Sequence, residues 1–237
     1  MKFQKLAIAA ALGAASTLAV AGGFDGPFVQ LGIGGSATQN KLSDATTNDG
    51  GNLNGTQSGG SFNGLVAAGY SQDFGAFNDS LKGFNLAANL FYVIGNQKAG
   101  SSSNSWNSTT DAGVVGSMNG NYKLQNTWGI SIEPGWNFTD STLGYVKLAW
   151  VNSQAKSNIT YSDTAGGSDW INGNKNINGF GYGLGVKHLV TKNIFVGVDL
   201  MGVTYGNSFN NSDSKGDSFA KNKFSQFMGF ASVGYKF

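Results

Sequence analysis

The chain has 237 residues, of which 40% are hydrophobic, 13% aromatic and only 12% charged, with 37 glycines, two prolines and no cysteine. This is twice the usual share of glycine and half the usual share of charge, and the aromatic content excludes a disordered polar chain. All 15 basic residues are lysines, so we expect no nucleic-acid partner, and the lack of cysteine excludes a disulfide scaffold, a thiol nucleophile and a zinc–thiolate site.

Residues 1–21 have the pattern of a cleaved secretory signal peptide. Lys2 and Lys5 form a positive start, residues 6–20 form an alanine-rich apolar core, and Ala19-Val20-Ala21 gives the small-x-small cleavage pattern. The apolar core is too short for a transmembrane anchor. We therefore expect a mature chain of residues 22–237 that forms one domain, with 13 lysines against 13 acidic residues once Lys2 and Lys5 are removed.

The mature chain contains short segments in which apolar residues alternate with polar or small ones. In residues 84–94 and 128–138 every even position is apolar, whereas the odd positions include Asn, Ser, Gly and Glu. Each apolar row covers about 11 residues, the length that a tilted strand needs to cross a membrane. The alternation predicts eight strands, at about 27–36, 61–72, 81–96, 118–138, 142–154, 177–190, 194–205 and 224–237.

The connections between these strands alternate in length. Long ones, rich in Asn, Ser, Gly and Thr, are predicted at 37–60, 97–117, 155–176 and 206–223, and short ones at 73–80, 139–141 and 191–193. An even strand count with this alternation predicts an all-β, eight-stranded antiparallel up-and-down transmembrane β-barrel. Residues 113–125 could form a separate ninth strand, but an odd count would leave the termini on opposite sides, so this stretch is assigned to the fourth strand.

The two faces of the strands distinguish a membrane barrel from a soluble sandwich. A sandwich would carry ordinary numbers of charges on its exposed face, whereas here the non-apolar face is mostly Gly, Asn, Ser and Ala. Lipid offers no partner to backbone amides, so the sheet must close on itself with its apolar face outward. Aromatic residues at the ends of the apolar rows suit interfacial girdles; these are Phe84, Tyr92, Trp128, Phe138, Trp150, Phe180 and Tyr235.

The last predicted strand ends in a terminal phenylalanine, with Tyr235, Val233 and Ala231 alternating before Phe237. This resembles the C-terminal signal of outer-membrane β-barrel proteins that the barrel-assembly machinery recognises. With the leader and the eight-strand pattern, the mature chain resembles the small opacity-protein and OmpA transmembrane-domain superfamily of Gram-negative bacteria. The resemblance implies an outer-membrane monomer with both termini in the periplasm, in contact with lipid and lipopolysaccharide. Full-length OmpA has a further periplasmic domain after its barrel, and this sequence shows none after Phe237. The resemblance therefore does not imply peptidoglycan anchoring.

Four charged residues have inward parity within the predicted strands: Glu133, Lys147, Lys187 and Asp199. A three-residue turn at 139–141 would pair Phe138 with Thr142 and would put Glu133 directly opposite Lys147, while Lys187 and Asp199 would be roughly diagonal. The four charges would neutralise one another in the narrow lumen, where an unpaired charge is costly. Two interpretations are open: a structural core, or a switchable polar plug like the ion-pair network implicated in gating of OmpA-like barrels.

Glycines at 179, 181, 183 and 185 remove the side chains from one wall of the lumen. We expect Tyr145 on one neighbouring strand, and Met201, Val203 and Tyr205 on the other, to fill this space. An eight-stranded barrel is only just wide enough for its own side chains, so a permanent wide pore is not expected.

Enzyme chemistry finds little support in the sequence. The one histidine, His188, is predicted near the periplasmic rim and faces lipid beside Val186 and Val190, the wrong end and face for a lipid-modifying triad. Glu133 is the single glutamate, and the loop aspartates lack the spacing of a calcium loop. We therefore predict no catalytic residue, no metal and no cofactor.

The long loops are the remaining candidates for recognition. Trp106 and Trp170 lie in them among Ser and Asn, where each indole either anchors a partner or folds onto its own loop. The leading hypothesis is a surface protein that supports envelope integrity and adhesion, with a host or cell-surface ligand held by four outer loops. The alternative is a narrow gated pore for ions or small solutes, controlled by the four lumen charges.

Overall fold

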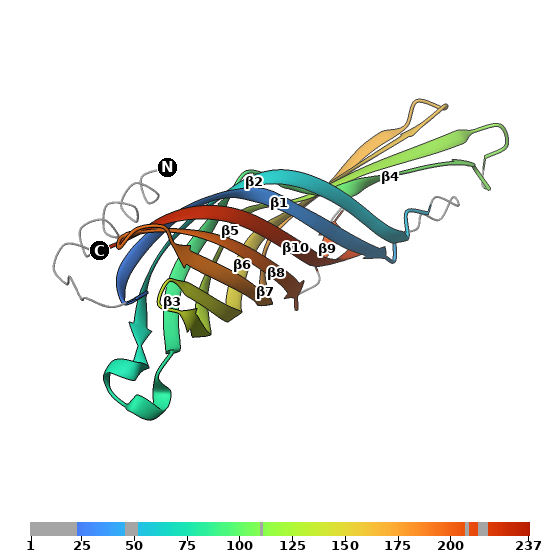
Figure 1. Ribbon diagram of the computed structural model, residues 1–237. Coiled ribbons are helices and arrows are strands. Elements are labelled where there is room, and N and C mark those ends of the chain that lie inside the picture. Colours follow the sequence, from blue (N-terminus) through green and yellow to red (C-terminus); the bar gives the residue numbers. More distant parts are fainter. Residues whose placement is uncertain (1–22, 46–51, 110, 207–208, 213–217) are drawn as a thin grey trace, which may run out of the picture.

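The computed structural model describes residues 23–45, 52–109, 111–206, 209–212 and 218–237. Predicted leader residues 1–21 lie outside these ranges. Alternating side chains over most of the chain produce an all-antiparallel sheet, shown in Figure 1. Its strands are β1 (Gly26–Ser43), β2 (Gly55–Asp73), β3 (Phe84–Ile94), β4 (Gln97–Asn107), β5 (Val115–Thr139), β6 (Thr142–Asp163), β7 (Ser168–Leu189), β8 (Ile194–Tyr205), β9 (Phe209–Ser212) and β10 (Ser218–Lys236).

The strands close into a ring of hydrogen bonds. The order is β1-β2-β3-β5-β6-β7-β8-β10, and β10 pairs with β1 from Phe28↔Lys236 to Ser43↔Lys221. β4 continues β3 along the same edge of β5, and β9 continues β8 along the same edge of β10. The described residues thus form the predicted eight-stranded antiparallel barrel, with two of its eight positions each broken into two strands.

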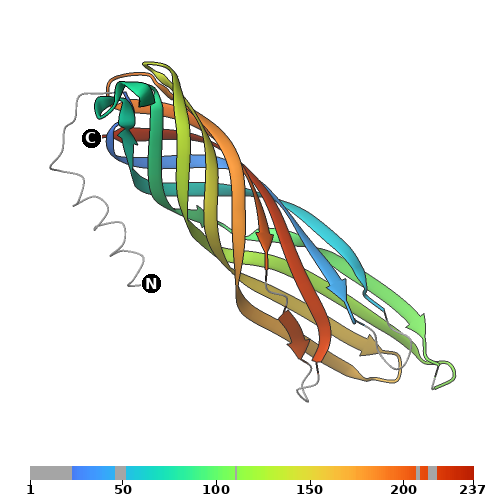
Figure 2. The same cartoon turned by 90° about the horizontal axis from the view of Figure 1, so that it is seen from below.

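The short connections gather at one end of the barrel. They are the two-residue turn between Thr139 and Thr142, the turn between β7 and β8, and a β2–β3 connection with two 3₁₀ turns, η2 (Phe74–Ala76) and η3 (Asp79–Leu81). The C-terminus lies at this end, opposite the extended β4, β5, β6 and β7, as both views show (Figures 1 and 2). No helix within the described ranges is both long enough and apolar enough to cross a membrane.

The polarity of the wall inverts part-way along the strands, as β6 illustrates. Its odd positions face the lumen throughout, and its even positions face outward. The outward residues are apolar as far as Trp150 and polar from Asn152 onward. Beyond Trp150 the lumen-facing residues include the fully buried Ala155 and Ile159. One half of the wall is therefore suited to lipid, and the other half has the polarity of a water-soluble protein.

This inversion explains where the strand predictions were wrong. Much of each predicted long loop is strand: β1 continues to Ser43, β2 begins at Gly55, β6 continues to Asp163 and β7 begins at Ser168. All of β4 lies in the predicted 97–117 loop. The apolar rows end where the outward face becomes polar, but backbone pairing continues. Two expectations were confirmed, because β8 has the predicted bounds and β5 is one continuous strand from Val115 to Thr139.

An apolar belt surrounds the half of the barrel that holds the short turns. Its outward residues include Leu31, Ile132 and Val198, all of which are exposed. On β5 it extends from Trp128 to Phe138, about 33 Å along a strand at about 3.3 Å per residue, which suits the roughly 25 Å apolar band of a barrel with tilted strands. Aromatic residues lie at both margins: Trp128, Trp150, Phe180 and Phe227 on one side, and Tyr70, Trp136, Phe138 and Tyr235 on the other.

Candidate functional site

The four predicted lumen charges come from four consecutive strands of the ring. Glu133 lies on β5, Lys147 on β6, Lys187 on β7 and Asp199 on β8, and all four are buried. The pairs Ile132↔Leu148 and Gly135↔Tyr145 give the register that sets Glu133 opposite Lys147. The turn itself differs from the expectation, because Thr139 pairs with Thr142 and an irregularity follows Asn137.

The charges form a single chain of ion pairs across the lumen. Lys147 Nζ lies 2.7 Å from Asp199 Oδ1 and 3.1 Å from Glu133 Oε1, and Lys187 Nζ lies 2.8 Å from Glu133 Oε2. Lys187 and Asp199 are diagonal in register, since Gly185 pairs with Asp199 and Lys187 with Gly197. However, the Lys187 side chain reaches across the lumen to Glu133. The two acids and two lysines compensate one another, which is the condition for burying charge at tolerable cost.

Neutral polar side chains complete this charged layer. Asn89 Nδ2 donates to Glu133 Oε1 at 2.7 Å, Tyr145 Oη donates to Asp199 Oδ1 at 2.5 Å, and Gln30 Nε2 donates to Asp199 Oδ2 at 3.2 Å. Ser131 Oγ bonds Asn89 Oδ1 at 2.9 Å. Sequence reasoning did not assign these residues to the layer. Their inward parity was a usable signal. Asn89 and Ser131 are register partners on adjacent strands, whereas Tyr145 and Gln30 each reach Asp199 past one intervening strand.

Apolar side chains close the lumen between the charged layer and the short-turn end. This group, the short-turn cluster, contains Phe24, Phe28, Ala87, Leu143, Tyr145 and Phe195. Lys187 Nζ lies 4.7 Å from the centre of the Phe28 ring and 4.6 Å from that of Tyr145, within cation–π range. The cavity lined by Phe28, Phe195 and Lys236 has a volume of about 10 Å³, room for about one water molecule.

A larger apolar core fills the lumen on the other side of the charged layer. This ribbon-side core includes Tyr205, Phe224, Met118, Leu124 and Ile159, each at most 1% exposed. It continues the lumen contents beyond the belt into the region where the outside of the wall is polar. The charged layer is therefore enclosed between two packed apolar regions.

The glycine run on β7 is filled as predicted. A Cβ on Gly179 would lie 2.9 Å from atoms of Tyr205 and Val203, and one on Gly181 would lie 3.1 Å from Met201 Sδ. At Gly185 the space is occupied by the ring of Tyr145. A Cβ on Gly183 would instead meet the backbone of Leu200 on β8. The run is therefore filled by neighbouring side chains and backbone and does not open a channel.

A closed antiparallel ring with an apolar belt outside and compensated charges inside meets the requirements for crossing a lipid bilayer. The chain has the fold of a small outer-membrane β-barrel. No family model and no curated protein matches its sequence. Among solved structures the barrel is similar to Ail of Yersinia pestis, with 12% sequence identity over 90% of this chain and 99% of that chain and a TM-score of 0.42. It is also similar to Neisserial surface protein A, with 16% identity over 89% of this chain and 97% of that chain and a TM-score of 0.40. A third similar structure is OprG of Pseudomonas aeruginosa, with 8% identity over 92% of this chain and 99% of that chain and a TM-score of 0.47.

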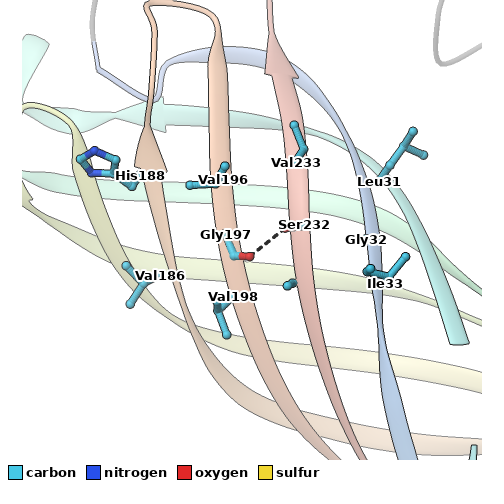
Figure 3. Close-up of a pocket in the computed structure, with 11 residues that line it drawn as sticks. Leu31, Gly32, Ile33, Val186, His188, Val196, Gly197, Val198, Ser232 and Val233 are labelled. Carbon is cyan, nitrogen blue, oxygen red and sulfur yellow. Dashed lines mark hydrogen bonds between the residues drawn. The ribbon is translucent and has the colours of Figure 1, made fainter. Parts of the chain in front are cut away.

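His188 lies on the outside of the barrel near the short-turn rim. Its Nδ1 is 3.0 Å from Thr142 Oγ1, and its ring is exposed. Figure 3 shows it at the margin of a shallow apolar groove of about 660 Å³ on the outer wall, with Val186, Val196 and Leu31. The groove belongs to the lipid-facing belt. Within the described residues no group of three or more His, Cys, Asp or Glu side chains could hold a metal ion.

The two candidate tryptophans have different surroundings, and both lie in strands. Trp106 on β4 packs against the ribbon-side core, with its ring centre 5.8 Å from that of Tyr161. Trp170 on β7 is 66% exposed. Trp106 therefore packs onto the barrel itself, whereas the indole of Trp170 is exposed on the surface.

The residues of the predicted assembly signal lie at the barrel seam. Tyr235 is exposed to lipid, and its ring centre is 5.0 Å from that of Phe237 in an edge-to-face contact. Phe237 N donates to Pro27 O at 3.0 Å, so the end of the chain is bonded to the start of β1. Recognition of this signal by the assembly machinery stays a prediction.

Proposed function

We propose that this barrel is a non-enzymatic, monomeric surface protein that supports envelope integrity and binds a host or cell-surface ligand through its outer β-ribbons. The outer β-ribbons are the parts of β1, β2, β4–β7 and β10 beyond the apolar belt. In this proposal the leader is cleaved on export and the outer ribbons form the surface antigen. Closure of the ring within one chain supports a monomer, and the lipid-facing position of His188 supports the absence of catalysis.

The observation that carries the proposal is the exposed Trp170 on a β-ribbon that stands outside the belt. An indole that is 66% exposed in water costs hydrophobic free energy, and tryptophan is enriched among the residues that dominate protein interfaces. Its strand partner is Thr160 on β6, so the surrounding wall is polar. A rigid ribbon that presents one large aromatic residue on a polar surface suits recognition.

The test is adhesion of bacteria that express the full chain, either unchanged or with Trp170→Ser. Adhesion is counted on cultured epithelial cells and on surfaces coated with laminin or fibronectin. Val115→Ser is the matched control, because Val115 is also exposed and lies at the end of a ribbon. We expect the unchanged chain to raise adhesion above the vector level, Trp170→Ser to remove most of this gain, and Val115→Ser to keep it.

Equal adhesion with and without the chain on all surfaces would contradict the proposed recognition. Loss of adhesion with both variants would instead assign it to general ribbon hydrophobicity and would contradict the role of Trp170. Surface display of each variant is measured by antibody labelling of intact cells, so that a failure of export is distinguished from a failure of binding.

A gated pore is the second candidate, and one contact favours it. Lys147 is shared between Glu133 and Asp199, whereas Lys187 binds Glu133 alone among the ion pairs of the described residues. Transfer of Lys147 fully to Asp199 would break the chain of ion pairs without leaving either acid unpaired. The layer therefore has a second arrangement of comparable charge balance, which a gate requires.

A further inference from the structure

Three lysines form a row on the outer wall, five to six residues beyond the aromatic margin of the belt. Lys98 on β4 pairs in register with Lys123 on β5, and Lys123 pairs with Lys156 on β6. Their chain neighbours, such as Leu124 and Ala155, are buried in the lumen, so the three lysines share the outward face. We call Lys98, Lys123 and Lys156 the lysine row.

Such a row is unfavourable on its own. Like charges directly opposite each other on neighbouring strands destabilise a sheet. None of the ion pairs between described residues involves the lysine row. Along β6 the next acid is Asp163, seven residues from Lys156, or about 23 Å at about 3.3 Å per residue, well beyond the roughly 8 Å Debye length at physiological salt. The cost of this arrangement would be offset by a bound anion.

The lysine row borders a hollow of about 550 Å³ whose other polar side chains include Ser58, Ser101, Asn121 and Asn158. Lysine, amide and hydroxyl groups all donate hydrogen bonds, and the lining contains no carboxylate. The hollow is therefore complementary to an anion that has several acceptor oxygens.

The backbone builds this hollow at a β-bulge. Pairing between β4 and β5 shifts between Lys98 and Ser101, and Gly100 in the gap has φ +95°. A Cβ on Gly100 would lie 2.7 Å from Ser58 N, so only glycine lets β4 approach β2 so closely. The concave shape is thus a fixed feature of the sheet, and it does not depend on flexible side chains.

The height of the lysine row on the wall identifies the occupant. Lys123 lies five residues beyond Trp128, and Lys156 lies six residues beyond Trp150, about 20 Å along a tilted strand at about 3.3 Å per residue. Both tryptophans belong to the aromatic margin where the hydrocarbon ends. We propose that the lysine row and its hollow bind the phosphate groups of a glycolipid headgroup in the outer leaflet. This site is separate from the ribbon recognition proposed for Trp170 and needs only the outer-membrane location.

The test compares two triple variants of the refolded chain in zwitterionic detergent micelles. One carries Lys98→Gln, Lys123→Gln and Lys156→Gln, and the control carries Lys82→Gln, Lys192→Gln and Lys221→Gln, which removes the same charge away from β4, β5 and β6. The probes are a bisphosphorylated lipid A glycolipid, the same glycolipid after removal of its phosphates, and heparin as a soluble sulfated polyanion. The apparent Kd for each probe is measured by thermophoresis at physiological salt.

We expect the unchanged chain to bind the phosphorylated glycolipid at least tenfold more tightly than either other probe. The lysine-row variant should lose at least tenfold in that affinity, while the control should stay within about threefold of the unchanged chain. Without glycolipid the lysine-row variant should unfold at the same or a higher temperature, because repulsion between like charges has been removed. A triple Lys→Arg variant at the three row positions should keep the binding. If the triple Gln variant does not refold, the affinity of the single variant Lys123→Gln for the phosphorylated glycolipid is measured instead.

Three outcomes would overturn the proposal. Equal affinity for the glycolipid with and without its phosphates would show that the acyl chains carry the binding. An unchanged affinity in the lysine-row variant would assign phosphate binding to another surface. Tighter binding of heparin that depends on the lysine row would make a soluble sulfated glycan the ligand.

Discussion

Lys147 holds the charged layer together, because its ammonium group contacts both Asp199 and Glu133. We predict that Lys147→Met lowers the free energy of unfolding by about 3–5 kcal/mol, since it leaves acidic groups buried without their shared cation. Urea unfolding of the refolded barrel in micelles, followed by tryptophan fluorescence, measures this loss. Lys192→Met in the exposed β7–β8 turn is the control, and a loss no larger than the control's would show that the layer tolerates an unpaired acid.

Asp25 gives a second prediction at this scale, outside the membrane-spanning strands. It precedes β1, and its carboxylate accepts a hydrogen bond from Asp73 N. Burial raises the pKa of Asp25 above its ordinary 3.8, and the nearby charge of Asp73 acts in the same direction, against the Asp73 N–H bond and Lys236. The folded state therefore holds this proton more tightly than the unfolded chain, and the free energy of unfolding falls as pH rises from about 3.8 through the raised pKa.

Asp25→Asn removes this penalty and keeps an oxygen to accept the Asp73 N–H bond. We expect the variant to be more stable than the unchanged chain at pH 7, and the difference to disappear near pH 3. Urea unfolding of both proteins at pH 3, 5 and 7 checks the trend. A difference that grows toward acid pH would reverse the assigned sign.

At the scale of strands, the sequence predicted the structure well where the outward residues face lipid and must therefore be apolar. The apolar rows located the belt, the parity identified all four lumen charges, and the register of β5 and β6 set Glu133 opposite Lys147. Beyond the belt the signal disappeared, because Asn152 and Gln154 face water while backbone pairing continues. The contact between Lys187 and Glu133 was also missed, since it joins β7 to β5 past the intervening strand β6 and is not a register pair.

The glycines of β7 allow a test of lumen packing. We predict that Gly185→Ala lowers the free energy of unfolding by about 1–3 kcal/mol, because the new methyl group overlaps the Tyr145 ring and disturbs its bond to Asp199. Gly202→Ala on β8 is the matched control, since its methyl group would meet Tyr182 at 3.4 Å, an ordinary contact on the outer face. Equal stability of the two variants in urea would mean that Tyr145 has room to move.

At the scale of the whole molecule, the two apolar regions on either side of the charged layer predict a closed barrel. We expect the refolded mature chain to show no discrete openings in planar bilayers, and Lys147→Ala to show none either, because the short-turn cluster and the ribbon-side core still exclude ions. Insertion is verified by protection of the belt from protease. Openings whose size or frequency changes with Lys147→Ala would instead favour the gated pore.

The inverted polarity of the wall has a consequence for how this protein can vary in length. Side chains alternate between lumen and exterior with a period of two, so a hairpin lengthened by two residues in each strand keeps every existing residue on its own side. A single inserted residue would turn residues such as Ile159 outward and their polar neighbours inward. The height of the ribbons beyond the belt can therefore change in paired steps. Peptide tags inserted as even-numbered extensions of the β6–β7 hairpin should leave the membrane-embedded half undisturbed.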